Sequence, residues 1–347
     1  MKHVTRFCIM LAVLLIAGQA LAVFNQGHRG TGTNMVGNPF PENTIPSFLQ
    51  AFAEGADMVE LDCTLSADDE VVVIHDDSLD RTTDCSGAVY DWDLVDIKTC
   101  DAAVGTPLQG TGVEVPTLAE VFAALDAAKY TGEVNVEIKG SLVGVVGAAH
   151  LAERVTDEIL LAGWEDRIIF SCFSASVLDE VELIDSAWIT AYLTSEVNVN
   201  AQADLAYEHG FDGLHPYFAQ TFAPQVDYAH GLGLFVNVWT LDVPALMQSM
   251  INRGVDGIIT NDPEKLAPLL DDDDDDTTDD DTTDDDTTDD DTTDDDTATD
   301  DDDEDTRGDA AGDPPLPPDP SLPPPRPAAS VRDRDRGSDR DLCNEST

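Results

Sequence analysis

The segment EVNVEIKGSLVGVVGAAHLAERVTDEILLAGWEDRIIFSC, residues 133–172, decides the fold of this chain. It opens with a strand-like run at 133–138, continues through an amphipathic stretch at 147–162 and closes with a second strand-like run at 167–172. Two short apolar strands joined by a helix are typical of a parallel β-α-β unit. The segment therefore predicts an α/β protein.

The same alternation extends along the chain on both sides of this segment. Further strand-like runs lie at residues 23–26, 58–64, 188–193, 211–215, 234–239 and 256–260, and helix-like stretches at 44–54, 118–128, 175–184, 201–209, 222–229 and 243–252. Eight such repeats in roughly 250 residues predict a (β/α)₈ TIM barrel, which we place at residues 23–270. The alternative is an open doubly wound sheet, but no glycine-rich phosphate turn follows the first strand-like run.

One segment, at about residues 84–116, interrupts the alternation after the second strand. It reads as a small loop-like insertion above the barrel mouth, and a short extra strand at 71–74 leads into it. It contains Cys85 and Cys100, which flank a polar loop and form the most plausible disulfide pair. Cys63 and Cys172 lie in strand-like runs, where packed free thiols are an equally good interpretation.

The N-terminus has the pattern of a removable export signal at residues 1–22. Lys2 and Arg6 precede an apolar stretch that is short for a membrane span, and a small-residue site ends at Ala22. We therefore expect cleavage after Ala22 and a secreted or periplasmic protein, in a compartment that permits disulfides. No other segment reads as a transmembrane span.

Charge divides the chain into two parts with different properties. The formal net charge is −54, and residues 271–347 hold 32 acidic residues against six Arg, which leaves −28 for residues 1–270. Nucleic acid and anionic membranes are therefore disfavoured as partners. The Asp/Thr repeat at 271–306 and the Pro-rich, then Arg/Asp-rich tail at 307–347 predict disorder. Dense carboxylates in the repeat predict at most weak Ca²⁺ binding, because the shaping residues of a Ca²⁺ loop are missing.

Chemistry-bearing residues recur at the ends of the predicted strands. Alternate strand residues share a face, so the pairs Glu60/Asp62 and Glu137/Lys139 each point to one side. The remaining members of this group are His28, Arg29 and His75. Because the C-terminal ends of barrel strands share one rim, these groups should converge there. Three carboxylates suit a hard divalent cation, Ca²⁺ or Mg²⁺, with cationic side chains on an anionic substrate and two imidazoles as acid and base.

Several ordered motifs then match a known family. They are His28-Arg29-Gly30, Pro41 to Thr44, Gly55 to Asp62, Val73 to Asp76, Leu79 to Thr83, Val136 to Lys139, Val238 to Thr240 and Asp256 to Pro263. Over residues 24–270 the chain resembles the glycerophosphodiester phosphodiesterase family. The resemblance implies a TIM barrel that hydrolyses glycerophosphodiesters to glycerol 3-phosphate and an alcohol with a divalent metal.

The resemblance also implies a role for each matching residue. His28 and His75 look like the acid–base pair, with His28 favoured as the base. Glu60, Asp62 and Glu137 look like the metal ligands, and Arg29 and Lys139 look like phosphate-binding residues. Glu42 and Trp239 join the substrate-binding set.

Two other functions remain open from the sequence. One is a related barrel phospholipase, of the phospholipase C or sphingomyelinase D type. The other is a non-catalytic surface-binding protein that uses its acidic tail.

Overall fold

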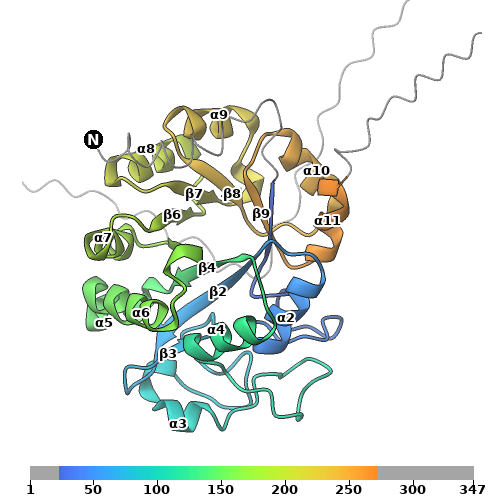
Figure 1. Ribbon diagram of the computed structural model, residues 1–347, viewed down its shortest axis with the longest axis vertical. Coiled ribbons are helices and arrows are strands. Elements are labelled where there is room, and N and C mark those ends of the chain that lie inside the picture. The colour runs from blue at the N-terminus through green and yellow to red at the C-terminus, as the bar shows by residue number, and fades with distance from the viewer. Residues whose placement is uncertain (1–22, 272–347) are drawn as a thin grey trace, which may run out of the picture. The chain divides into compact units, whose positions relative to one another are not determined.

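The computed structural model describes residues 23–271, and these residues contain a closed parallel barrel (Figure 1). Its strands are β1 (Phe24–Gly27), β2 (Met58–Leu65), β4 (Glu133–Ile138), β5 (Ile168–Cys172), β6 (Ile189–Thr194), β7 (Gly213–Pro216), β8 (Phe235–Val238) and β9 (Gly257–Thr260). Each pairs in parallel with its neighbour, and β1 pairs with both β9 and β2, which closes the ring. The predicted TIM barrel is confirmed.

Helices follow the strands and surround the barrel (Figure 1). They are α2 (Ile45–Ala53), α4 (Leu118–Ala127), α6 (Ala148–Ala162), α7 (Ala175–Ile184), α8 (Val199–His209), α9 (Ala223–Gly231), α10 (Pro244–Asn252) and α11 (Pro263–Asp271), with the short α5 (Val143–Val146) before α6. The last helix, α11, was not among the predicted stretches. It begins at Pro263, a residue favoured in the first helical turn because its ring fixes φ and it lacks an N–H that needs a partner.

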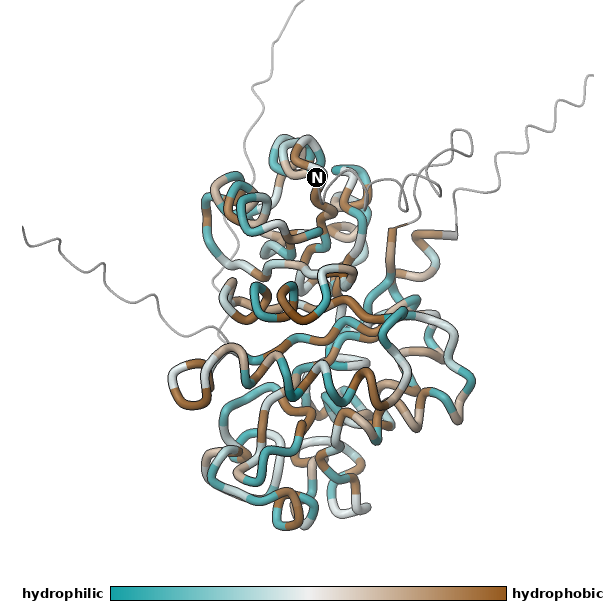
Figure 2. The backbone as a smooth tube through the Cα atoms, turned by 60° about the vertical axis from the view of Figure 1, so that its left-hand side comes forward, coloured by the Kyte–Doolittle hydropathy of each residue, from teal (hydrophilic) through white to brown (hydrophobic). Residues whose placement is uncertain are grey.

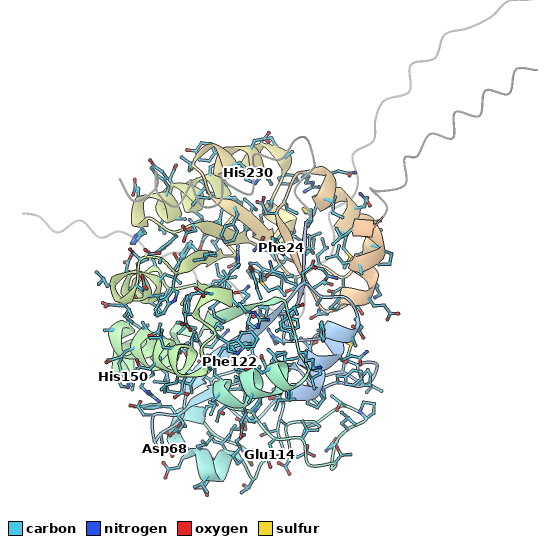
Figure 3. The ribbon with its side chains drawn as sticks, in the orientation of Figure 1. Phe24, Asp68, Glu114, Phe122, His150 and His230 are labelled. Carbon is cyan, nitrogen blue, oxygen red and sulfur yellow. A yellow bond between two sulfur atoms is a disulfide. The ribbon has the colours of Figure 1, made fainter. Side chains whose placement is uncertain are left out.

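Outward-facing strand residues pack against these helices. In β4 the alternate residues Val134, Val136 and Ile138 are fully buried in the main core. Phe122 lies on α4 (Figure 3). Its ring stacks on that of Trp164, which follows α6, with 4.9 Å between centroids. Burying each such side chain contributes about 1.5–3 kcal/mol. Hydrophobic and hydrophilic residues alternate along the helices, as expected for helices with one buried face (Figure 2).

Inward-facing residues fill the barrel in layers. Met58, Ile169 and Ala191 form an apolar layer near the N-terminal ends of the strands. Asn135 in β4 then donates to Gln26 Oε1 at 3.3 Å and accepts from Ser171 Oγ at 2.8 Å. Because strand residues alternate, the next inward positions of β2 and β4 lie toward the C-terminal rim, where the predicted site residues are.

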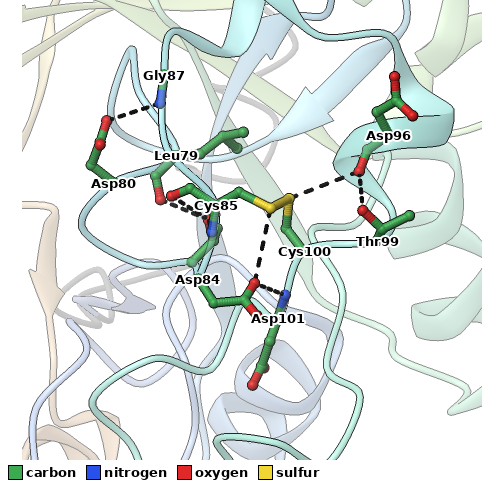
Figure 4. Close-up of a disulfide and its surroundings, with 10 residues drawn as sticks. Leu79, Asp80, Asp84, Cys85, Gly87, Asp96, Thr99, Cys100 and Asp101 are labelled. Atoms are coloured by element: carbon green, nitrogen blue, oxygen red, sulfur yellow. Dashed lines mark hydrogen bonds between the residues drawn. A yellow bond between two sulfur atoms is a disulfide. The ribbon is translucent and has the colours of Figure 1, made fainter.

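The insertion is closed by the predicted disulfide. Cys85 and Cys100 form a disulfide (Figure 4), whereas Cys63 and Cys172 are buried free thiols. Strand β3 (Val71–Val73) leads in and pairs antiparallel with β2. The insertion has more regular structure than the predicted loop. It contains a 3₁₀ turn at Val89–Asp91 and the short helix α3 (Leu94–Ile97), and it packs on a small apolar cluster that includes Val72 of β3.

Several predictions concern residues outside the described part of the chain. These are the export signal at 1–22, the Asp/Thr repeat and the tail that follows it. Within residues 23–271, no helix combines the length and the apolar composition that crossing a bilayer requires.

Candidate active site

Three carboxylates gather inside the barrel, toward the C-terminal ends of β2 and β4. Glu60 and Asp62 are alternate residues of β2, and Glu137 of β4 pairs with Asp62 in the sheet register. Ligand oxygens of the three lie within 4.8 Å of one another, and all three residues are buried. Burial, with the charges of Asp62 and Glu137, raises the pKa of Glu60 well above its usual range. Such a buried acidic cluster favours a bound cation.

Two cationic side chains flank this cluster. Lys139 Nζ donates to Glu137 Oε1 at 2.6 Å and to Asp62 Oδ1 at 3.2 Å. On the other side, Arg29 Nε lies 3.5 Å from Asp62 Oδ2, and the Arg29 backbone N–H donates to Glu60 Oε2 at 2.8 Å. Although burial opposes ionisation, the nearby positive charges, Lys139 first among them, hold the pKa of Asp62 well below its usual range.

The charges of this group fit a divalent cation together with a phosphodiester. Three carboxylates against Arg29 and Lys139 leave one net negative charge. A divalent cation would make the group singly positive, and a phosphodiester monoanion would then neutralise it. All-oxygen donors suit Ca²⁺ or Mg²⁺ rather than a softer metal. The residues present therefore fit the predicted cofactor.

His28 is held by an amide. It follows β1, and its Nδ1 lies 2.7 Å from Asn261 Oδ1. The orientation of that amide is fixed by Asp242, which accepts from Asn261 Nδ2 at 2.7 Å and from the Asn261 backbone N–H at 2.8 Å. Since a carboxylate only accepts, the amide oxygen must face His28, and His28 Nδ1 must carry the proton. Burial and the charge of Arg29 lower the pKa of His28 to about 3.

His75 is held by a carboxylate. It lies two residues beyond β3, and its Nδ1 is 2.7 Å from Asp76 Oδ1, so the ring donates from Nδ1 here as well. Its side chain is 33% exposed. Both imidazoles are close enough to Asp62 to interact electrostatically with it. Neither ring hydrogen-bonds through Nε2 to any residue from 23 to 271, so each has that nitrogen available for a substrate.

Glu42 lies behind Arg29 rather than in the open site. Its side chain is 1% exposed, and it accepts from Arg29 Nη1 at 2.8 Å and from the backbone N–H of Asn34 at 2.9 Å. Arg81 adds two hydrogen bonds, at 2.7 and 2.8 Å. Although burial opposes it, these partners, with Arg81 the strongest, lower the pKa of Glu42 to about 2. Glu42 therefore stays ionised and orients Arg29.

Trp239 belongs to an aromatic wall at the same end of the barrel. It follows β8, and its Nε1 donates to the carbonyl oxygen of His215 at 2.8 Å. Its ring centroid lies 5.5 Å from those of Phe173, which follows β5, and Tyr217, which follows β7. Phe173 is 45% exposed. Three strand ends thus give the rim an apolar sector besides its acidic one.

The structure adds residues that the sequence argument did not select. They are Asn43, which donates to Asp62 Oδ2 at 2.8 Å, the pair Asp76 and Arg81, and the pair Asp242 and Asn261. Except for Asp242, all lie inside the motifs that carried the family resemblance. The sequence assigned no role to Asp76, and its hydrogen bond to His75 reveals one.

Comparison with known proteins agrees with this geometry. Residues 28–265 match the model of the glycerophosphoryl diester phosphodiesterase family. A glycerophosphodiester phosphodiesterase from Caldanaerobacter subterraneus subsp. tengcongensis is 35% identical over 243 residues, which are 70% of this chain and 96% of the relative. A lysophospholipase D from Rattus norvegicus is 34% identical over 278 residues, covering 70% of this chain and 84% of the relative.

Solved structures share the fold. An Oleispira antarctica phosphodiesterase in complex with the product sn-glycerol-3-phosphate superposes with a TM-score of 0.63 at 26% identity, covering 71% of this chain and 96% of that one. A Silicibacter pomeroyi protein, described as a glycerophosphoryl diester phosphodiesterase, reaches a TM-score of 0.65 at 23% identity, covering 74% and 95%. At that identity the second likeness supports the fold alone.

Proposed function

Since this chain belongs to the glycerophosphoryl diester phosphodiesterase family, we propose that His28 and His75 catalyse its reaction as base and acid. The chain is a glycerophosphodiester phosphodiesterase, a phosphoric diester hydrolase that produces glycerol 3-phosphate. The observation that carries the mechanism is the difference between the two partners, an amide for His28 and a carboxylate for His75.

His28 acts as the base. A base must be neutral before it accepts a proton, and a low pKa keeps His28 neutral at physiological pH. With the proton fixed on Nδ1, the lone pair of Nε2 takes the proton of the nucleophile. The nucleophile is water or the free glycerol hydroxyl of the substrate, which would form a cyclic phosphate that water then opens. Its oxygen forms the new bond to phosphorus.

His75 acts as the acid. The bond between phosphorus and the alcohol oxygen breaks, and that oxygen takes a proton from His75 Nε2. Asp76 beside Nδ1 stabilises the imidazolium that must exist before this step. The proton that His28 has gained and the proton that His75 has lost balance, so the pair is reset through solvent before the next cycle.

The remaining residues bind and neutralise the phosphate. Arg29 and Lys139 supply fixed positive charges, and Glu60, Asp62 and Glu137 would hold the divalent cation. That cation supplies charge stabilisation to the non-bridging phosphate oxygens. On the apolar side of the rim, Trp239 gives the substrate a flat surface.

A reversible chelation assay on a panel of substrates tests this function. EDTA should abolish release of glycerol 3-phosphate from glycerophosphocholine, and Ca²⁺ or Mg²⁺ should restore it. Full activity in EDTA would contradict the proposed requirement for a divalent cation. Intact sphingomyelin and lysolipid belong in the panel, since preferential cleavage of either would favour the sphingomyelinase D or phospholipase type.

We also propose that the enzyme is exported and acts outside the cytoplasm. The signal pattern at residues 1–22 supports this, as does a disulfide between Cys85 and Cys100. N-terminal sequencing of the protein recovered from outside the cytoplasm should begin at Val23. Recovery of an uncleaved chain from the cytoplasm alone would contradict the proposal.

A further inference from the structure

Arg81 occupies a position that the mechanism above does not use. It lies between β3 and the disulfide-closed insertion, and its guanidinium binds two carboxylates at once. Nε and Nη2 donate to Asp76 at 2.6 and 2.8 Å, while Nη1 and Nη2 donate to Glu42 at 2.7 and 2.8 Å. A planar guanidinium matches a carboxylate in this two-point geometry, and here it does so twice.

The two carboxylates lead to opposite sides of the site. Asp76 accepts from His75 Nδ1 at 2.7 Å, and Glu42 accepts from Arg29 Nη1 at 2.8 Å. The residues therefore form one continuous chain from the proposed acid to the proposed phosphate-binding arginine. Arg81 is its central member, and every hydrogen bond in it is 2.8 Å or shorter.

The two ends of this chain differ in how firmly they are held. Glu42 is 1% exposed and has further hydrogen bonds to Asn34, so it is anchored without Arg81. Asp76 is 26% exposed, and its partners within residues 23–271 are His75 and Arg81 alone. Removing Arg81 would free Asp76, and His75 with it, more than it would free Arg29.

We propose that Arg81 is a positioning residue that fixes Asp76, so that His75 presents Nε2 to the departing alcohol oxygen. This rests on the proposed role of His75 as the acid. Groups that orient a reacting residue typically contribute about 10–100-fold to activity. Lysine cannot replace Arg81 fully, because a single ammonium lacks the fork that bonds both carboxylates.

The leaving group provides a test that general loss of structure would not mimic. An alkyl alcohol leaves as an unstable alkoxide and needs the proton of His75, whereas a nitrophenol leaves as a stable anion and does not. Arg81→Ala should lower kcat for glycerophosphocholine by about 10–100-fold. It should change kcat for the p-nitrophenyl ester of glycerol 3-phosphate by less than about threefold, with KM similar for both, because binding of the phosphate is retained. An equal loss on both substrates, or no loss on either, would overturn the proposal.

Matched variants keep the outcome interpretable. His75→Ala is the reference and should show the same selectivity in stronger form. If His75→Ala is selective and Arg81→Ala is not, the inference about Arg81 fails while the function stands. If His75→Ala loses both substrates equally, the acid role fails and takes the inference with it. Arg154→Ala, which removes an arginine ion-paired to Glu158 on α6, should leave both rates unchanged.

Two further measurements address a variant that does not fold and test whether Arg81 acts through Asp76. Should Arg81→Ala not fold, Arg81→Lys keeps the charge and should show the same selectivity with a loss of several-fold. In addition, Asp76→Ala should cost as much as Arg81→Ala, and the double variant no more than either single one. Additive losses on the choline ester would mean that Arg81 does not act through Asp76.

Discussion

The two histidines that we propose as base and acid differ in position and in hydrogen-bond partner. His28 is on the barrel itself, next to β1, and its half-buried ring is held by the amide of Asn261. His75 is at the base of the insertion, with its ring one-third exposed and held by the carboxylate of Asp76. Both an amide oxygen and a carboxylate orient an imidazole and favour its charged form, but the neutral amide does so less than the negatively charged carboxylate. In our proposal the hydrogen-bond partner of each ring, more than its position in the sequence, distinguishes the base from the acid.

The strongest test of this comparison removes His28. His28→Ala should reduce kcat by about 10²–10⁴-fold, the usual contribution of a general base. The loss should be similar for alkyl and nitrophenyl leaving groups, because the nucleophile must be deprotonated in both reactions. Steady-state rates on both substrates measure this, with thermal unfolding as the control for folding. A variant with near-normal kcat would show that His28 is not the base.

Exchanging the partner of His28 should have the next largest effect. The double variant Asn261→Asp with Asp242→Asn swaps an amide and a carboxylate and keeps their hydrogen bonds possible. His28 would then face a carboxylate, as His75 does, and its pKa should rise by roughly 1–3 units. Because only the neutral ring is a base, activity should fall at acidic pH where the wild type still works.

The pH profile of kcat/KM measures this exchange. Its acidic limb should move to higher pH in the double variant, while the rate well above neutral pH stays close to that of the wild type. Asp242→Asn alone serves as the control, since it loosens the amide without adding a negative charge beside His28. An unmoved acidic limb would mean that His28 does not limit the rate there.

Removing the disulfide of the insertion should impair the proposed acid His75 and leave the proposed base His28 unaffected. The loss of activity should be smaller than in the two preceding experiments. Cys85 and Cys100 are 15 residues apart, and closing a loop of that length is worth about 3 kcal/mol in the chain-entropy model. The double variant Cys85→Ser, Cys100→Ser should make residues 84–116 more sensitive to protease. The rate on glycerophosphocholine should fall several-fold, with less change on the nitrophenyl ester. A reductant should reproduce the effect in the wild type and leave the double variant unchanged. Equal losses on both substrates would argue against the link to His75.

The sequence predicts the frame of this molecule well, for a physical reason. Barrel strands show as short apolar runs, and helices as amphipathic stretches, so periodicity alone locates them. The helix α11 was not predicted, because Pro268 lies inside it and interrupts its helical pattern. The cluster of three carboxylates could be predicted for the same reason as the strands, since Glu60 and Asp62 share a face by alternation and Glu137 pairs with Asp62 in register.

The hydrogen-bond partners of the histidines could not be predicted from the sequence in this way. Asn261 lies 233 positions beyond His28, and Arg81 meets Glu42 across 39 positions. No local pattern encodes such contacts, because they arise from closure of the barrel and folding of the insertion. The motifs include Asn261 and Arg81 without assigning them roles, and the hydrogen bonds add support to the assignment of base and acid that the resemblance favours.

A third histidine, His215, extends the comparison of His28 with His75, and its replacement should have the smallest effect on activity. His215 on β7 is fully buried beneath the site, bonded through Nε2 to Asn237 Nδ2 at 3.1 Å. Burial alone lowers its pKa to about 3, as low as that of His28. A depressed pKa therefore marks a buried imidazole and does not by itself mark a catalytic one.

Protonation of His215 should matter for stability and little for turnover. Unfolded, it takes up a proton near pH 6.5, but folded it does so only near pH 3, so between these values the unfolded state binds more protons. Its contribution is constant above pH 6.5 and is lost at up to about 1.4 kcal/mol per unit as pH falls below that value. His215→Gln should thus flatten the fall in unfolding free energy between pH 6 and 4, while kcat at pH 7 stays within about twofold. Denaturant titrations across that range measure the slope.

His230→Gln is the control. Asp256 raises the pKa of that exposed ring, so removing the ring should not flatten the fall in unfolding free energy between pH 6 and 4. An unchanged slope in His215→Gln would mean that the buried ring takes up its proton without unfolding the barrel.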